Sequence, residues 1–188
     1  MDEFPRRHRI TVGEYYRMAE VGLLAPDARV ELIDGEIFDM PPIGSRHAAL
    51  AHHLHHLLSG ALGHRAMARM QVPVRLDDYS EPQPDVSVVA YREDFYVTRH
   101  PIASEVLLLV EVSETTLRYD QQIKGALYAH HGIPEYWIVD MKRKQLHVSR
   151  RPTSTGYVET VSIDRPATMP VIALPEAAVD VSPLFASI

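Results

Sequence analysis

The sequence predicts an α/β fold, and three features of the chain support this prediction. Residues 106–113 form an apolar run rich in leucine and valine, as expected of a central strand buried on both faces. A helical segment follows and stops at Gly132, and Pro134 prevents it from continuing. Residues 135–140 then form a second apolar strand, so a strand, a helix and a strand follow one another.

The N-terminal part of the chain predicts a short helix and a β-hairpin. Thr11 and Glu14 have the spacing of a capping box, which predicts a helix that extends through residue 21. Residues 30–33 and 36–40 are strand-like and flank Asp34 and Gly35, a pair that tolerates the positive φ angles of a two-residue turn.

A longer helix is expected over residues 45–62, with Ser45 as its N-cap. Its leucines recur at helical spacing and define a buried face. His52 and His56 lie outside this face. That histidine pair fits either a metal ligand pair or, more simply, a solvated polar face. His47 falls on the inward side, so it is either a core histidine or an active-site group.

The remaining segments complete a sheet. Strands are expected over residues 69–76, 82–90 and 145–148, and residues 153–188 form a sheet edge with a terminal turn. Trp137 lies in an apolar strand and is expected in the core. The chain shows no internal repeat and no linker, so residues 1–188 are expected to form a single domain.

Composition limits the classes of function. The chain has no cysteine, which excludes disulfides and thiolate metal sites and favours a reducing cytoplasm. It lacks a signal-peptide pattern and a membrane-spanning apolar run, so we expect a soluble, cytoplasmic protein without a membrane partner. The net charge of −6 means that any contact with nucleic acid must be local.

Two acids interrupt apolar strands and are the first candidates for chemistry. Glu111 lies within the buried run, and Asp85 alternates with Val86 and Val88. A buried carboxylate is costly unless a metal, a proton or a partner compensates it. If the strands are neighbours, the two acids meet on one face and suit Mg²⁺ or Mn²⁺, which prefer oxygen ligands. A buried ion pair with a lysine is the alternative.

Lys124 is the third candidate. It lies on the helix expected over residues 121–131, for which Asp120 is the predicted N-cap. An ammonium group near a metal-bound water can orient it or help to deprotonate it, and can stabilise negative charge that develops on a phosphate. Asp85, Glu111 and Lys124 together suggest phosphodiester hydrolysis.

Several separated motifs resemble one known family. They are QPDVSVV around Asp85, LLLVEVSETTLRYD around Glu111, the helix with Lys124, GIPEYWIVD, ELIDGEIFDM and SRHAAL. In their order and spacing along the chain, these motifs resemble the Uma family of restriction-endonuclease-like proteins, within the PD-(D/E)XK nuclease superfamily. The resemblance extends from about residue 15 to the C-terminal strands.

The resemblance implies a restriction-endonuclease-like fold with a central mixed β-sheet flanked by helices, and a metal held by Asp85 and Glu111. The superfamily's usual lysine stands two residues after the second acid, where this chain has Ser113. Uma-like proteins take that lysine from the following helix, which here implies Lys124. Glu31 matches a further family acid and could contact the metal or its water; an exposed hairpin residue is the alternative.

The leading hypothesis is therefore a Mg²⁺- or Mn²⁺-dependent DNA endonuclease, with Glu31 and His47 as further site candidates. Cutting a duplex would favour a homodimer. The rivals are a non-catalytic nucleic-acid-binding or assembly module and a hydrolase of another phosphoester. The basic residues Lys142, Arg143, Lys144, Arg150 and Arg151 could contact phosphates, although a basic hairpin also protects a sheet edge.

Overall fold

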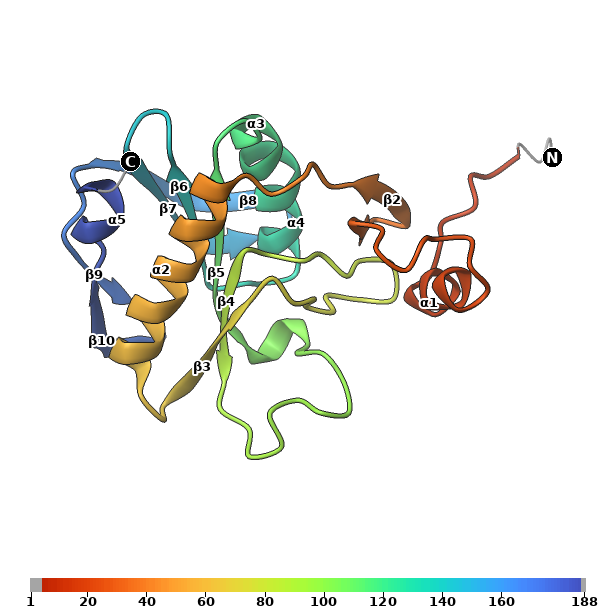
Figure 1. Ribbon diagram of the computed structural model, residues 1–188, viewed down its shortest axis with the longest axis horizontal. Coiled ribbons are helices and arrows are strands. Elements are labelled where there is room, and N and C mark those ends of the chain that lie inside the picture. Colours follow the sequence, from red (N-terminus) through yellow and green to blue (C-terminus); the bar gives the residue numbers. More distant parts are fainter. Residues whose placement is uncertain (1–4, 187–188) are drawn as a thin grey trace.

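A six-stranded mixed sheet lies at the centre of the computed structural model, which describes residues 5–186 (Figure 1). In sheet order its strands are β3 (Ala66–Met70), β4 (Val86–Ala90), β5 (Val106–Ser113), β6 (Glu135–Asp140), β7 (Gln145–Thr153) and β8 (Gly156–Asp164). Strands β5 and β6 are parallel, and the other neighbouring pairs are antiparallel. The predicted α/β fold with a central mixed sheet is confirmed.

Helices cover both faces of this sheet. The helical segments are α1 (Val12–Glu20), α2 (Ser45–Leu62), η1 (Ala103–Glu105), α3 (Leu117–Tyr119), η2 (Asp120–Lys124), α4 (Gly125–His130) and α5 (Ser182–Ala186). Helix α2 packs on one face, and α3, η2 and α4 form a continuous crossover helix between β5 and β6 on the other (Figure 1). A parallel strand pair requires such a crossover.

Strand β5 contributes to both cores, as its uniform apolar character predicts. Leu108, Val110 and Val112 join the core beneath α2, whereas Leu109 joins the core beneath the crossover helix. Since successive side chains of a strand point to opposite faces, Glu111 points to the side of the crossover helix. This alternation brings an acid of a central strand towards Lys124.

Two small hairpins flank the sheet. One pairs β1 (Val30–Ile33) with β2 (Glu36–Asp39), and the other pairs β9 (Thr168–Val171) with β10 (Leu174–Asp180). The turn of the first has positive φ at Asp34 and Gly35, as predicted. A Cβ atom at Gly35 would lie 2.6 Å from the Cβ of Arg9, so this turn also requires the absence of a side chain.

The capping box of α1 is confirmed. Thr11 Oγ1 accepts a hydrogen bond from the Glu14 N–H, and Glu14 Oε2 accepts one from the Thr11 N–H. The core position of Trp137 is confirmed as well, because its side chain is fully buried. Among the described residues, no helix combines the length and the apolar character needed to cross a bilayer.

Three expected boundaries before the site are wrong. The strand expected over residues 82–90 begins only at Val86, so Asp85 lies immediately before the strand and not within it. Gly44, and not Ser45, is the N-cap of α2, and Ser45 is the first helical residue. The strand expected over residues 69–76 ends at Met70, because Gln71 has a positive φ of 50° that turns the chain out of the ladder. Residues 71–76 therefore form a loop beside the start of β4.

The predicted role of Asp120 as an N-cap is also wrong. The crossover helix begins three residues earlier, at Leu117, and Asp120 has helical φ and ψ angles of −62° and −39°. Its carboxylate accepts a hydrogen bond from the Thr116 hydroxyl at 2.6 Å. The five residues from Asp120 to Lys124 form a π-helical turn, an irregularity that recurs at functional sites.

Candidate functional site

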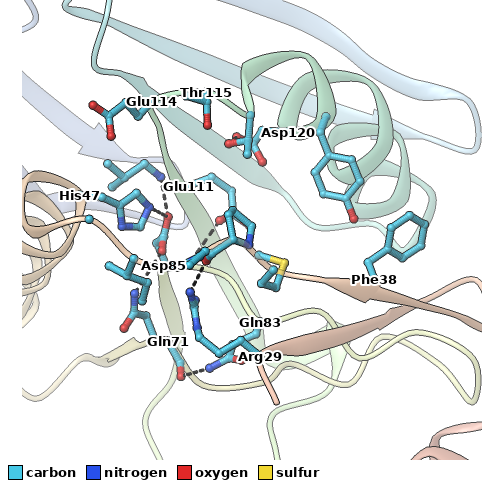
Figure 2. Close-up of a pocket in the computed structure, with 18 of the residues that line it drawn as sticks. Arg29, Phe38, His47, Gln71, Gln83, Asp85, Glu111, Glu114, Thr115 and Asp120 are labelled. Carbon is cyan, nitrogen blue, oxygen red and sulfur yellow. Dashed lines mark hydrogen bonds and ion pairs between the residues drawn. The ribbon is translucent and has the colours of Figure 1, made fainter. Parts of the chain in front are cut away.

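A cavity of about 320 Å³ lies where the start of β4 meets the end of β5, beneath the hairpin β1–β2 and the crossover helix (Figure 2). His47, Asp85, Glu111 and Lys124 line it. Glu31 lies against Lys124. The structure thus brings together all five site residues expected from the sequence.

Asp85 and Glu111 are held together through each other's backbone. Asp85 immediately precedes β4, whose first residue pairs with Val110. The Val112 N–H donates to Asp85 Oδ2 at 2.8 Å, and the Asp85 N–H donates to Glu111 Oε2 at 3.3 Å. The other Asp85 oxygen, Oδ1, has a 3.5 Å contact with the Gln71 amide. These backbone bonds hold both carboxylates at the cavity.

His47 lines the cavity and contacts Asp85. It lies in the first turn of α2, and its Nε2 is 3.0 Å from Asp85 Oδ2. This hydrogen bond raises the pKa of His47, although burial acts in the opposite direction. Its Nδ1 is buried and has no hydrogen-bond partner among the described residues.

Lys124 forms a buried ion triad with two glutamates. Its Nζ donates to Glu111 Oε1 at 3.0 Å and lies 3.2 Å from Glu31 Oε2, and the lysine is 1% exposed. Burial alone would lower the pKa of Lys124, but the two carboxylates outweigh it and the pKa is raised. The ammonium group is therefore charged at neutral pH.

Glu31 is a buried residue, so its alternative reading as an exposed hairpin position is wrong. It is 1% exposed and accepts hydrogen bonds from the Gln83 N–H at 3.2 Å and from the Tyr119 hydroxyl at 3.3 Å. It lies in β1, whose last three residues are all buried, and its carboxylate contacts Lys124. Glu31 thereby fixes the lysine from the side opposite Glu111.

The environment of Glu111 favours its protonated form in the absence of a cation. Burial is the main cause that raises the pKa of Glu111. Lys124 acts to lower this pKa and Asp85 to raise it, and the net pKa is about 8. Tyr128 also donates to Glu111 Oε1 at 2.9 Å. A divalent cation at this carboxylate would replace the proton and compensate the same buried charge.

Several cavity residues were not predicted from the sequence. They are Arg29, Gln71, Gln83, Thr116, Tyr119 and Asp120. Asp120 could have been found, because it stands four residues before Lys124 and residues so spaced share a helix face. Burial raises the pKa of Asp120, against the hydrogen bond from Thr116. Gln71 and Gln83 come from irregular loops that no periodicity marks.

The donor set fits a hard cation that keeps most of its waters. Asp85 and Glu111 each present a carboxylate to the cavity, and Mg²⁺ is commonly bound through one or two carboxylates plus substrate phosphates. Residues 5–186 contain no group of three or more histidine, aspartate or glutamate side chains placed to hold a metal ion. His52 and His56 therefore belong to no such group.

The arginines of the basic hairpin are paired with acids. Arg143 lies 3.1 Å from Asp140, Arg150 lies 2.6 Å from Glu135, and Arg151 lies 2.8 Å from Glu159. These contacts favour the interpretation of the hairpin as structural over a phosphate-binding role.

The sheet with its two helical layers and the acid pair in its cavity define a restriction-endonuclease-like protein. Residues 12–182 match the Uma2 family, described as "Putative restriction endonuclease", and the chain belongs to this family. The expected family is thus confirmed.

One solved structure, described as a putative nuclease belonging to DUF820 from Anabaena variabilis, is similar with a TM-score of 0.72. It is 21% identical, and the similarity covers 95% of this chain and 98% of that chain. At this identity the likeness shows the fold. A comparison with curated proteins found no match.

Proposed function

We propose that this protein is a Mg²⁺- or Mn²⁺-dependent endonuclease that hydrolyses phosphodiester bonds of DNA. One observation carries the proposal: Asp85 Oδ1 and Glu111 Oε2 belong to the same cavity and accept only long hydrogen bonds, of 3.5 and 3.3 Å. These oxygens therefore retain lone pairs for a cation. Family membership supports the nuclease class.

In this proposal Asp85 and Glu111 hold the cation. A divalent ion so bound supplies Lewis-acid chemistry and lowers the pKa of a bound water. His47 is a positioning residue, since its bond to Asp85 Oδ2 leaves Oδ1 for the cavity. A cation held there would require Glu111 in its carboxylate form, whereas burial favours the protonated form when no cation is bound.

Lys124 acts as a fixed positive charge and not as a base, because its ammonium group is held charged by Glu31 and Glu111. The water oxygen adds to phosphorus and one P–O ester bond breaks. The proton that the water loses passes to bulk solvent, and the leaving oxygen takes up a proton from solvent, which gives a phosphate monoester and an alcohol. A preorganised cation stabilises the negative charge that grows on the phosphoryl oxygens. Glu31 keeps the ammonium group of Lys124 in place.

Plasmid cleavage tests the proposal. The purified protein should nick or cut plasmid with Mg²⁺ or Mn²⁺ and stop when a chelator is added, and Asp85→Asn and Glu111→Gln should abolish cutting. Glu159→Gln, a change at an exposed strand residue, serves as the matched control. Full cutting by both site variants would overturn the assignment.

A second candidate is a binding or assembly module without catalysis. It is favoured by the contacts that Lys124 already makes with Glu31 and Glu111, and by Ser113 at the position of the usual lysine. This candidate predicts nucleic-acid binding without metal-dependent cleavage. The endonuclease proposal also leads us to expect a homodimer, because cutting both strands of a duplex needs two sites. Sedimentation of the active protein tests this expectation.

A further inference from the structure

An aromatic wall lines the cavity on the side away from His47 (Figure 2). It consists of Phe38, from β2, and Tyr119, from α3, whose ring centroids are 5.8 Å apart at 48°. Both side chains are partly exposed. Both rings pack at the edge of the core beneath the crossover helix, and the Tyr119 hydroxyl donates to Glu31. Hydrolysis of a phosphodiester requires no aromatic surface, so the exposed parts of these rings at the cavity are free to serve another purpose.

The reactive groups are recessed within the cavity. Asp85 is 9% exposed and Glu111 is 4% exposed, and the segment over residues 40–44 forms part of the rim above them. A volume of about 320 Å³ is at the lower end of pockets that enclose one small ligand. A nucleotide that stays base-paired in a duplex, whose major groove alone is about 12 Å wide, cannot enter such a space, so duplex DNA would have to present an unpaired or extruded nucleotide.

Arg29 supplies a cation at the mouth of this cavity. It lines the cavity, is exposed, and donates to the Pro41 carbonyl. No carboxylate forms a salt bridge with it among the described residues. Its remaining N–H groups can therefore contact a phosphate, for which the guanidinium group is well suited.

We propose that the cavity takes an unpaired nucleotide of single-stranded DNA, with its base stacked on the aromatic wall and a neighbouring phosphate on Arg29. The inference rests on the proposed nuclease function for the identity of the ligand and deepens it by naming the substrate class. Enzymes that do chemistry on a base in an enclosed pocket act on single strands or extrude the nucleotide from the duplex, which shows how such a pocket can admit one nucleotide. Aromatic side chains bind such bases without sequence preference.

A binding experiment without metal tests this substrate class separately from cleavage. A single-stranded oligonucleotide that contains 2-aminopurine is titrated with the protein in the presence of a chelator. Stacking should quench its fluorescence, and the single strand should bind more tightly than the same sequence as a duplex. Phe38→Ala should weaken binding roughly 5- to 150-fold, the range that corresponds to the loss of one stacked base.

Two variants serve as controls. Phe38→Tyr retains a ring and should retain the quenching. Phe95→Ala removes an aromatic side chain that is 65% exposed but lies beyond the opposite end of β4, so it should bind like the unaltered protein. Circular dichroism and thermal melting establish that each variant is folded.

The outcomes separate the two proposals. Equal or tighter binding of the duplex, together with unchanged binding by folded Phe38→Ala, would overturn the inference even if plasmid is cleaved. Quenching that depends on Phe38 in a protein that cleaves nothing with metal would support the inference and overturn the nuclease function.

Discussion

Two glutamates of adjacent strands in the central sheet are both buried, yet their surroundings differ. Glu135, at the start of β6, is 0% exposed and accepts hydrogen bonds from Trp137, Arg150 and the Ile172 N–H. Glu111 lies on β5, and its Oε1 accepts hydrogen bonds from Lys124 and Tyr128. Its Oε2, beside the cavity, accepts one bond of 3.3 Å from the Asp85 N–H.

The comparison shows that burial of an acid does not by itself indicate a functional site. Glu135 is fully satisfied, does not line the cavity and joins β6 to β7 and to the turn before β10. Glu111 has spare acceptor capacity where a ligand can enter. We therefore assign a structural role to the first and a chemical role to the second.

The largest expected effect is the loss of catalysis when the cavity acids are changed. Glu111→Gln and Asp85→Asn should each lower metal-dependent cleavage by about 10³-fold, because a bound metal contributes several kcal/mol to the stabilisation of the transition state. Steady-state cleavage of a labelled oligonucleotide measures the effect. Glu135→Gln should retain the activity of the folded fraction; an equal loss there would remove the distinction between the two acids.

Substitution of Glu135 should reduce the stability of the fold more than substitution of Glu111, the reverse of the order expected for activity. Glu135→Ala leaves Arg150 without its partner and should lower the free energy of unfolding by about 3 kcal/mol. Urea denaturation measures it. Glu111→Gln should lower stability much less, because a neutral side chain removes the desolvation cost that raises the pKa of Glu111. A Glu111→Gln protein as unstable as Glu135→Ala would contradict the assigned roles.

Removing the positive charge of Lys124 should affect both the cleavage rate and the stability of the fold. Lys124→Met leaves Glu31 and Glu111 without their shared partner, and cleavage should fall about 10²-fold, as for loss of one charge-stabilising donor. Lys142→Met, at an exposed turn position, is the control. Cleavage kinetics at equal folded concentration separate the catalytic from the structural loss, and an unchanged rate would exclude Lys124 from the reaction.

The pKa of Glu111 predicts how pH affects metal binding. A cation must replace the proton on Glu111, so affinity for Mn²⁺ should fall about tenfold for each pH unit below about 8. Titration calorimetry at several pH values measures this slope. An affinity that is flat from pH 6 to 8 would contradict the assignment.

The same group links pH to the stability of the metal-free protein. The unfolded chain releases this proton near the ordinary pKa of 4.5, whereas the folded chain retains it up to about 8. The folded state therefore binds the extra proton between these values, and its stabilisation, complete below 4.5, is lost as pH rises through 8. Glu111→Gln should remove this contribution.

The smallest effect is expected at a neutral neighbour of Glu111. Tyr128→Phe removes one hydrogen bond to Oε1 and should change stability by about 1 kcal/mol, because Lys124 still holds that oxygen. Thermal unfolding measures the change. A loss as large as that of Lys124→Met would make Tyr128 a principal support of the site.

The sequence predicted the parts of this molecule that local patterns specify. The capping box at Thr11, the turn at Asp34 and the buried strand of Glu111 each follow from residue types at fixed spacing. The two acids that interrupt apolar strands suggested the pairing of Asp85 with Glu111, and the family resemblance added the mixed sheet.

The parts that were missed depend on irregular backbone. The π-helical turn moves Asp120 into the helix, and the positive φ of Gln71 ends β3 early; neither residue type requires such a conformation. Glu135 carried no signal of its own, since only the folded chain brings Arg150 and residue 172 to it. Long-range contacts of this kind are not encoded in local periodicity.

The central claim is that Glu111, with Asp85, holds a divalent cation while Glu135 does not. Crystals grown with Mn²⁺ and measured at an energy where manganese scatters anomalously test it most directly. The predicted result is an anomalous peak within coordination distance of Asp85 and Glu111. Well-ordered carboxylates without a peak between them, at a Mn²⁺ concentration that supports cleavage, would contradict the assignment.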